Sequence, residues 1–345
     1  MEEKKTLPEQ PGENRKLLEV KDLKVSFFTP AGEVKAVDGI SYSLGYHEVM
    51  GIVGESGSGK SVEAYSIIGL LQSPGRVTGG SILYEGENVL DYDAEKMRQF
   101  RGNRVSMIFQ NPMTCLNPVY TIGNQLMEAL TCHDKSITKE QARARAIEML
   151  ELVGINNAEK RVDQYPHEFS GGMRQRAMIA MALICEPKLL IADEPTTALD
   201  VTIQAQILEL MKDLQQKEDT SIIFITHNLG VVAEICDRVS VMYAGRIVEQ
   251  GLVQDIFYNP QHPYTKGLIA STPRLDEETR ERLIPIEGTP IDLLNPPKGC
   301  NFGPRCRSCM KICLREKPPF AQIGEGHISA CWLHFMDRKE NTQDG

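Results

Sequence analysis

A short glycine-rich segment combines a lysine and a serine in a spacing that suits phosphate binding. It follows the apolar run 49–53 and consists of Gly54, Glu55, Ser56, Gly57, Ser58, Gly59, Lys60 and Ser61. Glycines let consecutive backbone N–H groups point at one anion, and a helix that begins there adds its positive end. The Lys60 ammonium can then reach nucleotide phosphates and the Ser61 hydroxyl can bind Mg²⁺. The pattern predicts a strand, a phosphate loop and a helix.

Two adjacent acids form a second candidate group. Asp193 and Glu194 follow a predicted buried strand that begins at Lys188 and is apolar from Leu189 to Ala192. Asp193 is positioned to hold Mg²⁺, usually through water, and Glu194 to polarise an attacking water. Two acids can also be an ordinary solvated strand end, but the phosphate loop in the same chain favours the metal-binding interpretation.

Gln110 and His227 each follow a segment that is predicted to be a buried strand, 105–109 and 221–226. A single histidine is more often structural than catalytic. In parallel α/β sheets, however, ligands bind beyond the carboxyl ends of the strands. We therefore expect both side chains to lie near the phosphate loop and the paired acids.

Ser170, Gly171 and Gly172 precede a helical segment that extends to about residue 185. Ser170 suits the N-cap position, and the glycines allow a second anion to approach a helix start. Taken alone, this segment predicts only a helix cap.

Phe27 and Phe28 are candidates to stack on a nucleotide base, because they precede the phosphate loop. Aromatic residues at strand positions usually pack in the core. Both interpretations of Phe27 stay open.

The remaining pattern predicts an α/β fold. Alternating apolar residues over 17–27 and 34–44 favour an antiparallel hairpin. Residues 79–84 predict another strand, and the helical periodicity of 121–185 predicts a helical subdomain inserted into the α/β core.

Bulk composition limits the possible functions. The chain has 345 residues, for which two domains are a fair expectation, and a formal net charge of −9. That charge argues against a partner bound through nucleic-acid backbones. No segment approaches the roughly 20 apolar residues of a membrane helix, and residues 1–16 predict a flexible tail without a secretory signal. We expect a cytosolic protein.

Five of the nine cysteines lie between residues 300 and 331. Disulfides are rare in a reducing compartment, so the cluster predicts a metal site before it predicts cross-links.

The motifs together resemble the ATP-binding subunits of ABC transporters over residues 17 to about 259. Ser-Gly-Gly-x-x-Gln separates this family from other P-loop NTPases. The matching motifs are Walker A (54–61), the Q-loop Gln110, the signature from Ser170 through Gly171 and Gly172 to Gln175, Walker B (Asp193, Glu194), the D-loop Asp200 and the H-loop His227. Phe169 replaces a usual leucine, and His47 stands where glycine is common; neither removes a catalytic group.

The resemblance implies a P-loop ABC ATPase core, with a RecA-like subdomain, an antiparallel β subdomain and a helical subdomain. It implies Glu194, His227 and Lys60 as catalytic residues, and Ser61, Gln110 and Asp193 as residues that hold Mg²⁺. Two subunits would sandwich two ATP molecules head to tail. The signature of one subunit would meet the nucleotide on Walker A of the other.

Residues 259–268, Asn-Pro-Gln-His-Pro-Tyr-Thr-Lys-Gly-Leu, resemble the C-terminal extension of oligopeptide/dipeptide importers, D-type subunits in particular. This implies an ATPase core over 17–259, an extension over 260–345 and a role in peptide import. Implied partners are an F-type ATPase subunit, two permease subunits and an extracellular solute-binding protein, with this chain peripheral on the cytoplasmic membrane face. Import of nickel or another small solute, or a non-transport ABC ATPase, are the alternatives.

The same resemblance implies a [4Fe–4S] cluster on Cys300, Cys306, Cys313 and Cys331. Four thiolates are what such a cluster needs. Cys309 makes the fourth ligand ambiguous, and a zinc site that uses Cys306 and Cys309 is the competing interpretation. Unligated thiols are the third.

Overall fold

The computed structural model describes residues 16–110, 115–196, 201–217, 219–272 and 285–336. The predicted tail, apart from Lys16, lies outside these residues, and so does Asp200.

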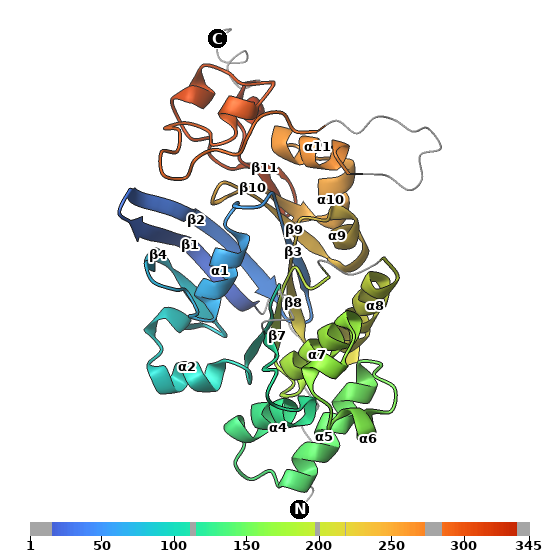
Figure 1. Ribbon diagram of the computed structural model, residues 1–345. Helices are drawn as coiled ribbons and strands as arrows, with labels where there is room; N and C mark the ends of the chain where they lie inside the picture. Colours follow the sequence, from blue (N-terminus) through green and yellow to red (C-terminus); the bar gives the residue numbers. More distant parts are fainter. Residues whose placement is uncertain (1–15, 111–114, 197–200, 218, 273–284, 337–345) are drawn as a thin grey trace, which may run out of the picture.

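The centre of the fold is an eight-stranded mixed sheet in the order β11-β12-β10-β9-β3-β8-β7-β6 (Figure 1). Strands β6, β7, β8, β3 and β9 are parallel neighbours. Every residue of β3, β6, β7 and β8 is buried, as expected for strands covered on both faces. The strands are β3 (Val49–Val53), β6 (Val105–Ile108), β7 (Leu189–Asp193), β8 (Ser221–Thr226), β9 (Arg238–Tyr243), β10 (Arg246–Leu252), β11 (Ala321–Gly324) and β12 (His327–Ser329).

A second, antiparallel sheet has the order β2-β1-β4-β5. Its strands are β1 (Lys16–Thr29), β2 (Gly32–Gly45), β4 (Gly75–Tyr84) and β5 (Glu87–Asn88). The predicted hairpin is confirmed, with Thr29 opposite Gly32 at its turn. Helix α1 (Lys60–Ile67) shares one hydrophobic cluster with both sheets, so the phosphate loop begins where the two sheets meet.

The helical subdomain is also confirmed, and it lies at the lower end of Figure 1. It contains α4 (Ile122–His133), α5 (Lys139–Leu152), α6 (Ala158–Arg161) and α7 (Gly171–Leu183). Thr138 forms a capping box with Gln141 at the start of α5. Ser170 is the predicted N-cap of α7, since its hydroxyl accepts the Met173 N–H at 3.3 Å. The signature segment is therefore fixed by local hydrogen bonds.

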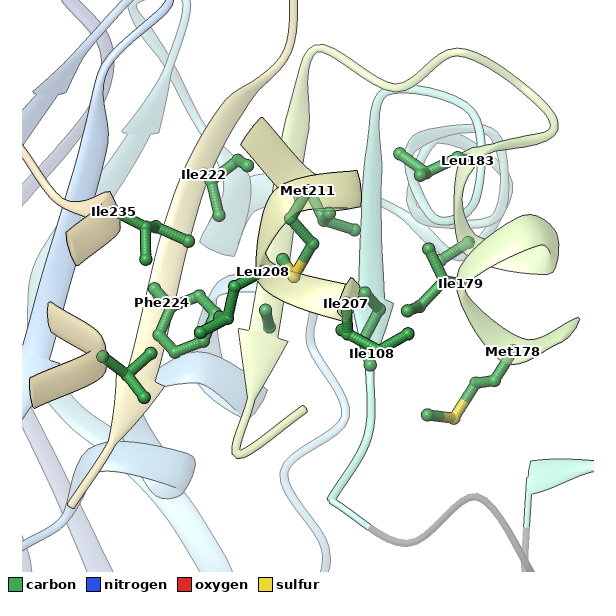
Figure 2. Packing of buried hydrophobic residues seen from close by; sticks show 14 of the residues in the cluster. Ile108, Met178, Ile179, Leu183, Ile207, Leu208, Met211, Ile222, Phe224 and Ile235 are labelled. Atoms are coloured by element: carbon green, nitrogen blue, oxygen red, sulfur yellow. The ribbon is translucent and has the colours of Figure 1, made fainter. Parts of the chain in front are cut away.

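Further helices surround the sheet: α2 (Ala94–Phe100), α8 (Val201–Lys217), α9 (Leu229–Ile235), α10 (Val253–Tyr258) and α11 (Pro263–Ala270). Figure 2 shows Ile207, Leu208 and Met211 of α8 packed between Phe224 of β8 and Ile179 of α7. This apolar layer ties the helical subdomain to the strands that carry the candidate site.

The C-terminal segment extends the main sheet, which the sequence did not indicate. β12 pairs with β10, placing Ser329 opposite Glu249. The fully buried Glu249 carboxylate contacts His327 Nε2 at 2.8 Å and accepts the N–H groups of Gln261 and His262 at 2.7 and 2.8 Å. These bonds offset the cost of burying the carboxylate. Within the described ranges, no helix is both long and apolar enough to cross a membrane.

His47 has a φ of 59°, in the left-handed region that glycine adopts without cost. This explains the glycine that resembling proteins often carry there. The Ser221 hydroxyl accepts the His47 N–H at 2.9 Å, and Gln215 donates to its carbonyl at 2.7 Å. Hydrogen bonds to distant residues therefore stabilise the turn before β3, where a glycine would adopt this conformation without them.

Replacing Glu63 by Gln should abolish part of the pH dependence of stability. Glu63 lies in α1, accepts a hydrogen bond from the Tyr42 hydroxyl and is fully buried. Burial raises the pKa of Glu63 from 4.5 to about 8. The folded state therefore holds a proton that the unfolded state releases between these values, so stability falls as pH rises through that window.

We expect the free energy of unfolding of the wild type, measured with urea and without nucleotide, to fall by about 2–4 kcal/mol more than that of Glu63→Gln between pH 5 and 8. Glu95→Gln, on the exposed face of α2, should follow the wild type. Parallel pH curves for wild type and Glu63→Gln would contradict a protonated Glu63.

Candidate nucleotide site

The phosphate loop connects β3 to α1 and depends on glycine at two close approaches. A Cβ atom on Gly54 would collide with the Met242 carbonyl oxygen, and one on Gly59 with that of Ala36. Gly59 is the N-cap residue of α1, with a φ of 101°, and it has no side chain that could bond to the first N–H groups of the helix. The first N–H groups of α1 are thus left for an external anion, which fits the predicted phosphate loop.

Lys60 points back into its own loop. Its ammonium donates to the carbonyl oxygens of Gly54 at 2.8 Å and Glu55 at 3.0 Å. Burial lowers the pKa of Lys60, and the nearby carboxylates of Glu194, Asp193 and Glu55 oppose that effect. A phosphate group would supply the oxygen atoms that now come from the backbone.

Asp193 and Ser61 fit a magnesium ion. Asp193 ends β7, is 1% exposed and accepts the Ser61 hydroxyl at 3.1 Å. Its second carboxylate oxygen is buried and has no hydrogen-bond partner among the described residues, and burial raises the pKa of Asp193. An oxygen pair of this kind suits Mg²⁺, which also keeps water and phosphate ligands.

Glu194 is the point where the strand ends converge. Gln110 Nε2 donates to one carboxylate oxygen at 2.7 Å, and His227 Nδ1 lies 3.0 Å from the other. Glu194 has a φ of 47°, and its N–H donates to Ile225 of β8 at 2.9 Å. Backbone strain of this kind is retained at functional sites when the surroundings enforce it. The predicted meeting of β6, β7 and β8 at one edge is present.

The signature residues lie on α7. Ser170 and Gly171 are exposed at its start, whereas Gln175 is buried and donates to the carbonyl of Pro195, next to Glu194. The signature therefore has a surface-facing end and an anchored end.

Phe27 is half-buried in β1, opposite Gly75 of β4. Phe28 is 47% exposed, and the Arg76 guanidinium lies 5.9 Å from the centre of its ring. Base stacking by Phe27 stays a prediction.

Two contacts to the phosphate loop were not predicted. The Tyr264 hydroxyl accepts the Glu55 N–H, and Arg305 pairs with the Glu55 carboxylate. Tyr264 and Arg305 belong to segments whose sequence resembles the importer extension, but no sequence signal indicates which residue each contacts.

The four proposed cluster cysteines are neighbours. The Cys300 N–H donates to the Cys313 carbonyl at 2.7 Å. Burial raises the pKa of Cys300 to about 11 and also raises that of Cys331, with smaller contributions from the other thiols. Even so, among the residues with described positions, no set of three or more His, Cys, Asp or Glu side chains is arranged to hold a metal ion. The thiols gather without forming a ready single-ion site.

Fold and site together define an ATP-binding cassette. Residues 37–197 match the family described as ABC transporter. The dimeric cassette MJ0796, in a post-hydrolysis state bound to ADP and Pi, superposes with a TM-score of 0.62 at 25% identity, covering 68% of this chain and 98% of that one. The protein cbiO1 of Clostridium perfringens, part of the transporter complex cbiONQ, gives 0.61 at 28% identity, covering 71% and 92%.

The chain belongs more particularly to the ATP-binding subunits of oligopeptide and dipeptide ABC transporters. Residues 248–313 match the C-terminal region of oligopeptide/dipeptide transporters. The oligopeptide transport ATP-binding protein OppD of Bacillus subtilis is 58% identical over 323 residues, 93% of this chain and 90% of that protein. OppD of Salmonella typhimurium is 52% identical over 95% of this chain and 96% of its own length.

Replacing Asp193 by Asn should weaken binding of Mg²⁺–ATP by about tenfold or more, because the buried oxygen pair loses its charge. In EDTA the same variant should bind ATP at least as well as the wild type, since a negative charge near the phosphates is gone. Calorimetric titration with and without Mg²⁺ measures both affinities. Asp163→Asn, on an exposed ion pair of the helical subdomain, is the control. An unchanged Mg²⁺ dependence would remove Asp193 from metal binding.

Proposed function

We propose that this chain hydrolyses ATP to energise import of oligopeptides or dipeptides through an ABC transporter. The carrying observation is the convergence of Lys60, Asp193, Glu194, Gln110 and His227 at one sheet edge. The 58% identity with an oligopeptide transport ATP-binding protein gives the transported class. Names of this kind among the relatives favour peptides over nickel or a non-transport role.

Hydrolysis is assigned to groups that already lie together. Lys60 binds and neutralises the phosphates, while Ser61 and Asp193 hold Mg²⁺, which supplies further charge stabilisation when bound. Glu194 accepts the proton of the attacking water. Gln110 is also assigned to the Mg²⁺ and His227 to steadying the γ-phosphate, and in this structure both side chains contact the Glu194 carboxylate. The bond from Ser61 to Asp193 and the contacts of Gln110 and His227 with Glu194 support these assignments.

The functional unit is proposed to be a head-to-tail pair with a similar F-type ATPase subunit. Exposed Ser170 and Gly171 at the start of α7 support a role outside this chain's own site. Such a surface would complete the nucleotide site of the partner. Gly172 and Gln175 support it from within α7.

The remaining partners are two permease subunits and an extracellular solute-binding protein that selects the peptide. We place this chain on the cytoplasmic face of the membrane, docked near Gln110. A core over 17–259 and an extension over 260–345 complete the assignment, with the β10 and β12 pairing as the connection between them.

A [4Fe–4S] cluster on Cys300, Cys306, Cys313 and Cys331 is proposed from the family resemblance of the C-terminal segment. Their proximity supports it, although the thiols are not arranged as a metal site. A four-iron cluster is larger than one ion, so its ligands lie further apart than those of zinc. Cys309 is exposed and serves as the comparison thiol.

Glu194→Gln should abolish turnover while retaining ATP binding, because the amide keeps the size of the side chain but cannot take a proton. We expect steady-state ATP hydrolysis by the assembled transporter to fall by about 10²-fold or more. Glu234→Gln, exposed on α9, should hydrolyse ATP normally. Full activity in Glu194→Gln would remove Glu194 from its role.

Anaerobically purified protein should be brown, absorb near ~400 nm and contain about four irons and four acid-labile sulfides per chain. Cys313→Ser should lose this iron and sulfide, whereas Cys309→Ser should keep them. Colourless protein with stoichiometric zinc would overturn the cluster, and equal loss in both variants would overturn the assignment of ligands.

A further inference from the structure

The phosphate loop is held from the C-terminal extension as well as from the ATPase core. Arg305 donates to both carboxylate oxygens of Glu55, at 2.6 and 3.0 Å, and the Tyr264 hydroxyl accepts the Glu55 N–H at 2.9 Å. We propose that Arg305 and Tyr264 are positioning residues that keep this loop in its nucleotide-binding shape. The inference rests on the proposed function.

The Arg305 side chain is largely buried. It is only 4% exposed, and it donates to the carbonyls of Glu287 at 3.0 Å and Ile286 at 3.3 Å. Its guanidinium lies 5.7 Å from the ring centre of Tyr243 and 6.0 Å from that of Phe302. A two-pronged Arg–carboxylate pair fixes direction as well as distance. Arg305 therefore fixes the position of the Glu55 carboxylate relative to the C-terminal extension.

The position of Glu55 is important because Lys60 also bonds to this residue. Its ammonium donates to the Gly54 and Glu55 carbonyls. When Lys60 turns toward a phosphate, the loop loses these two internal bonds. The side chain of Glu55 and its N–H remain tied to Arg305 and Tyr264, so the loop keeps its shape. Preorganisation of this kind increases affinity by avoiding an ordering cost on binding.

A second support reaches the other side of the loop. Asn301 donates to the Ala244 carbonyl at 3.0 Å, and the adjoining Gly245 N–H donates to the Ser58 carbonyl at 2.9 Å. Asn301 follows Cys300 in the chain, and Arg305 precedes Cys306. The residues that support both ends of the loop are thus next to two of the cysteines in the chain.

The experiment is a double-mutant cycle on the full-length chain. Arg305→Gln and Glu55→Gln should each raise the Kd for Mg²⁺–ATP by about tenfold, as for loss of a charged hydrogen bond. The double variant should bind no worse than either single variant, because the two residues act as one pair. In the assembled transporter, KM for ATP should rise while kcat changes less than about twofold, because the groups around Glu194 are untouched.

Arg307→Gln is the matched control. Arg307 lies two positions further on and pairs with Glu287 at the surface, where both side chains are at least 70% exposed. It should bind ATP like the wild type. Wild-type affinity in Arg305→Gln, or fully additive effects of the two single variants, would overturn the proposal.

Tyr264→Phe tests the same proposal if the extension unfolds when Arg305 is replaced. It removes only the hydroxyl from a fully buried ring, and its Kd should rise about threefold with an unchanged far-ultraviolet circular dichroism spectrum. An unchanged Kd in this folded variant would show that the Tyr264 hydroxyl does not position the loop. It would contradict the proposal that the extension keeps the loop in its nucleotide-binding shape. Failure of the wild-type chain to bind ATP at all would instead overturn the proposed function.

Discussion

A buried positive charge governs the arrangement of this protein. Removing the Lys60 ammonium from water is unfavourable unless oxygen atoms replace the lost solvent. Two loop carbonyls bond to it, and Asp193 and Glu194 lie close enough to favour its charged form. The loop and the ends of the parallel strands converge around this group, and the C-terminal extension is connected to it through Glu55.

The parallel sheet is what brings those oxygen atoms to the same place. Strands β3, β7 and β8 are buried along their whole length, so their ends are fixed by packing on both faces. Glu194 has a strained, left-handed backbone, and the hydrogen bond from its N–H to the Ile225 carbonyl maintains this conformation. The packed sheet thus stabilises a strained residue at the edge where the ends of β6, β7 and β8 meet.

Local patterns were enough to predict much of this arrangement. The spacing of glycines before Lys60 predicted the loop, and the position of Ser170 predicted a helix cap, because both depend on neighbouring residues. The pairing of Arg305 with Glu55 could not be predicted, since 250 positions separate them and neither residue type specifies its partner. The strands at 321–329 were missed for the same reason, because short segments become strands only when β10 offers an edge.

The pairing of β10 with β12 also means that β10 is synthesised well before the strand that covers its edge. Strand β10 presents an open edge at Glu249 and Gln250 until the ribosome has produced residues 327–329. By then every nucleotide-binding motif has long been synthesised. Open strand edges invite pairing with other chains. A product that stops short of β12 would carry all the groups proposed for hydrolysis and would still expose a strand edge at which chains can aggregate.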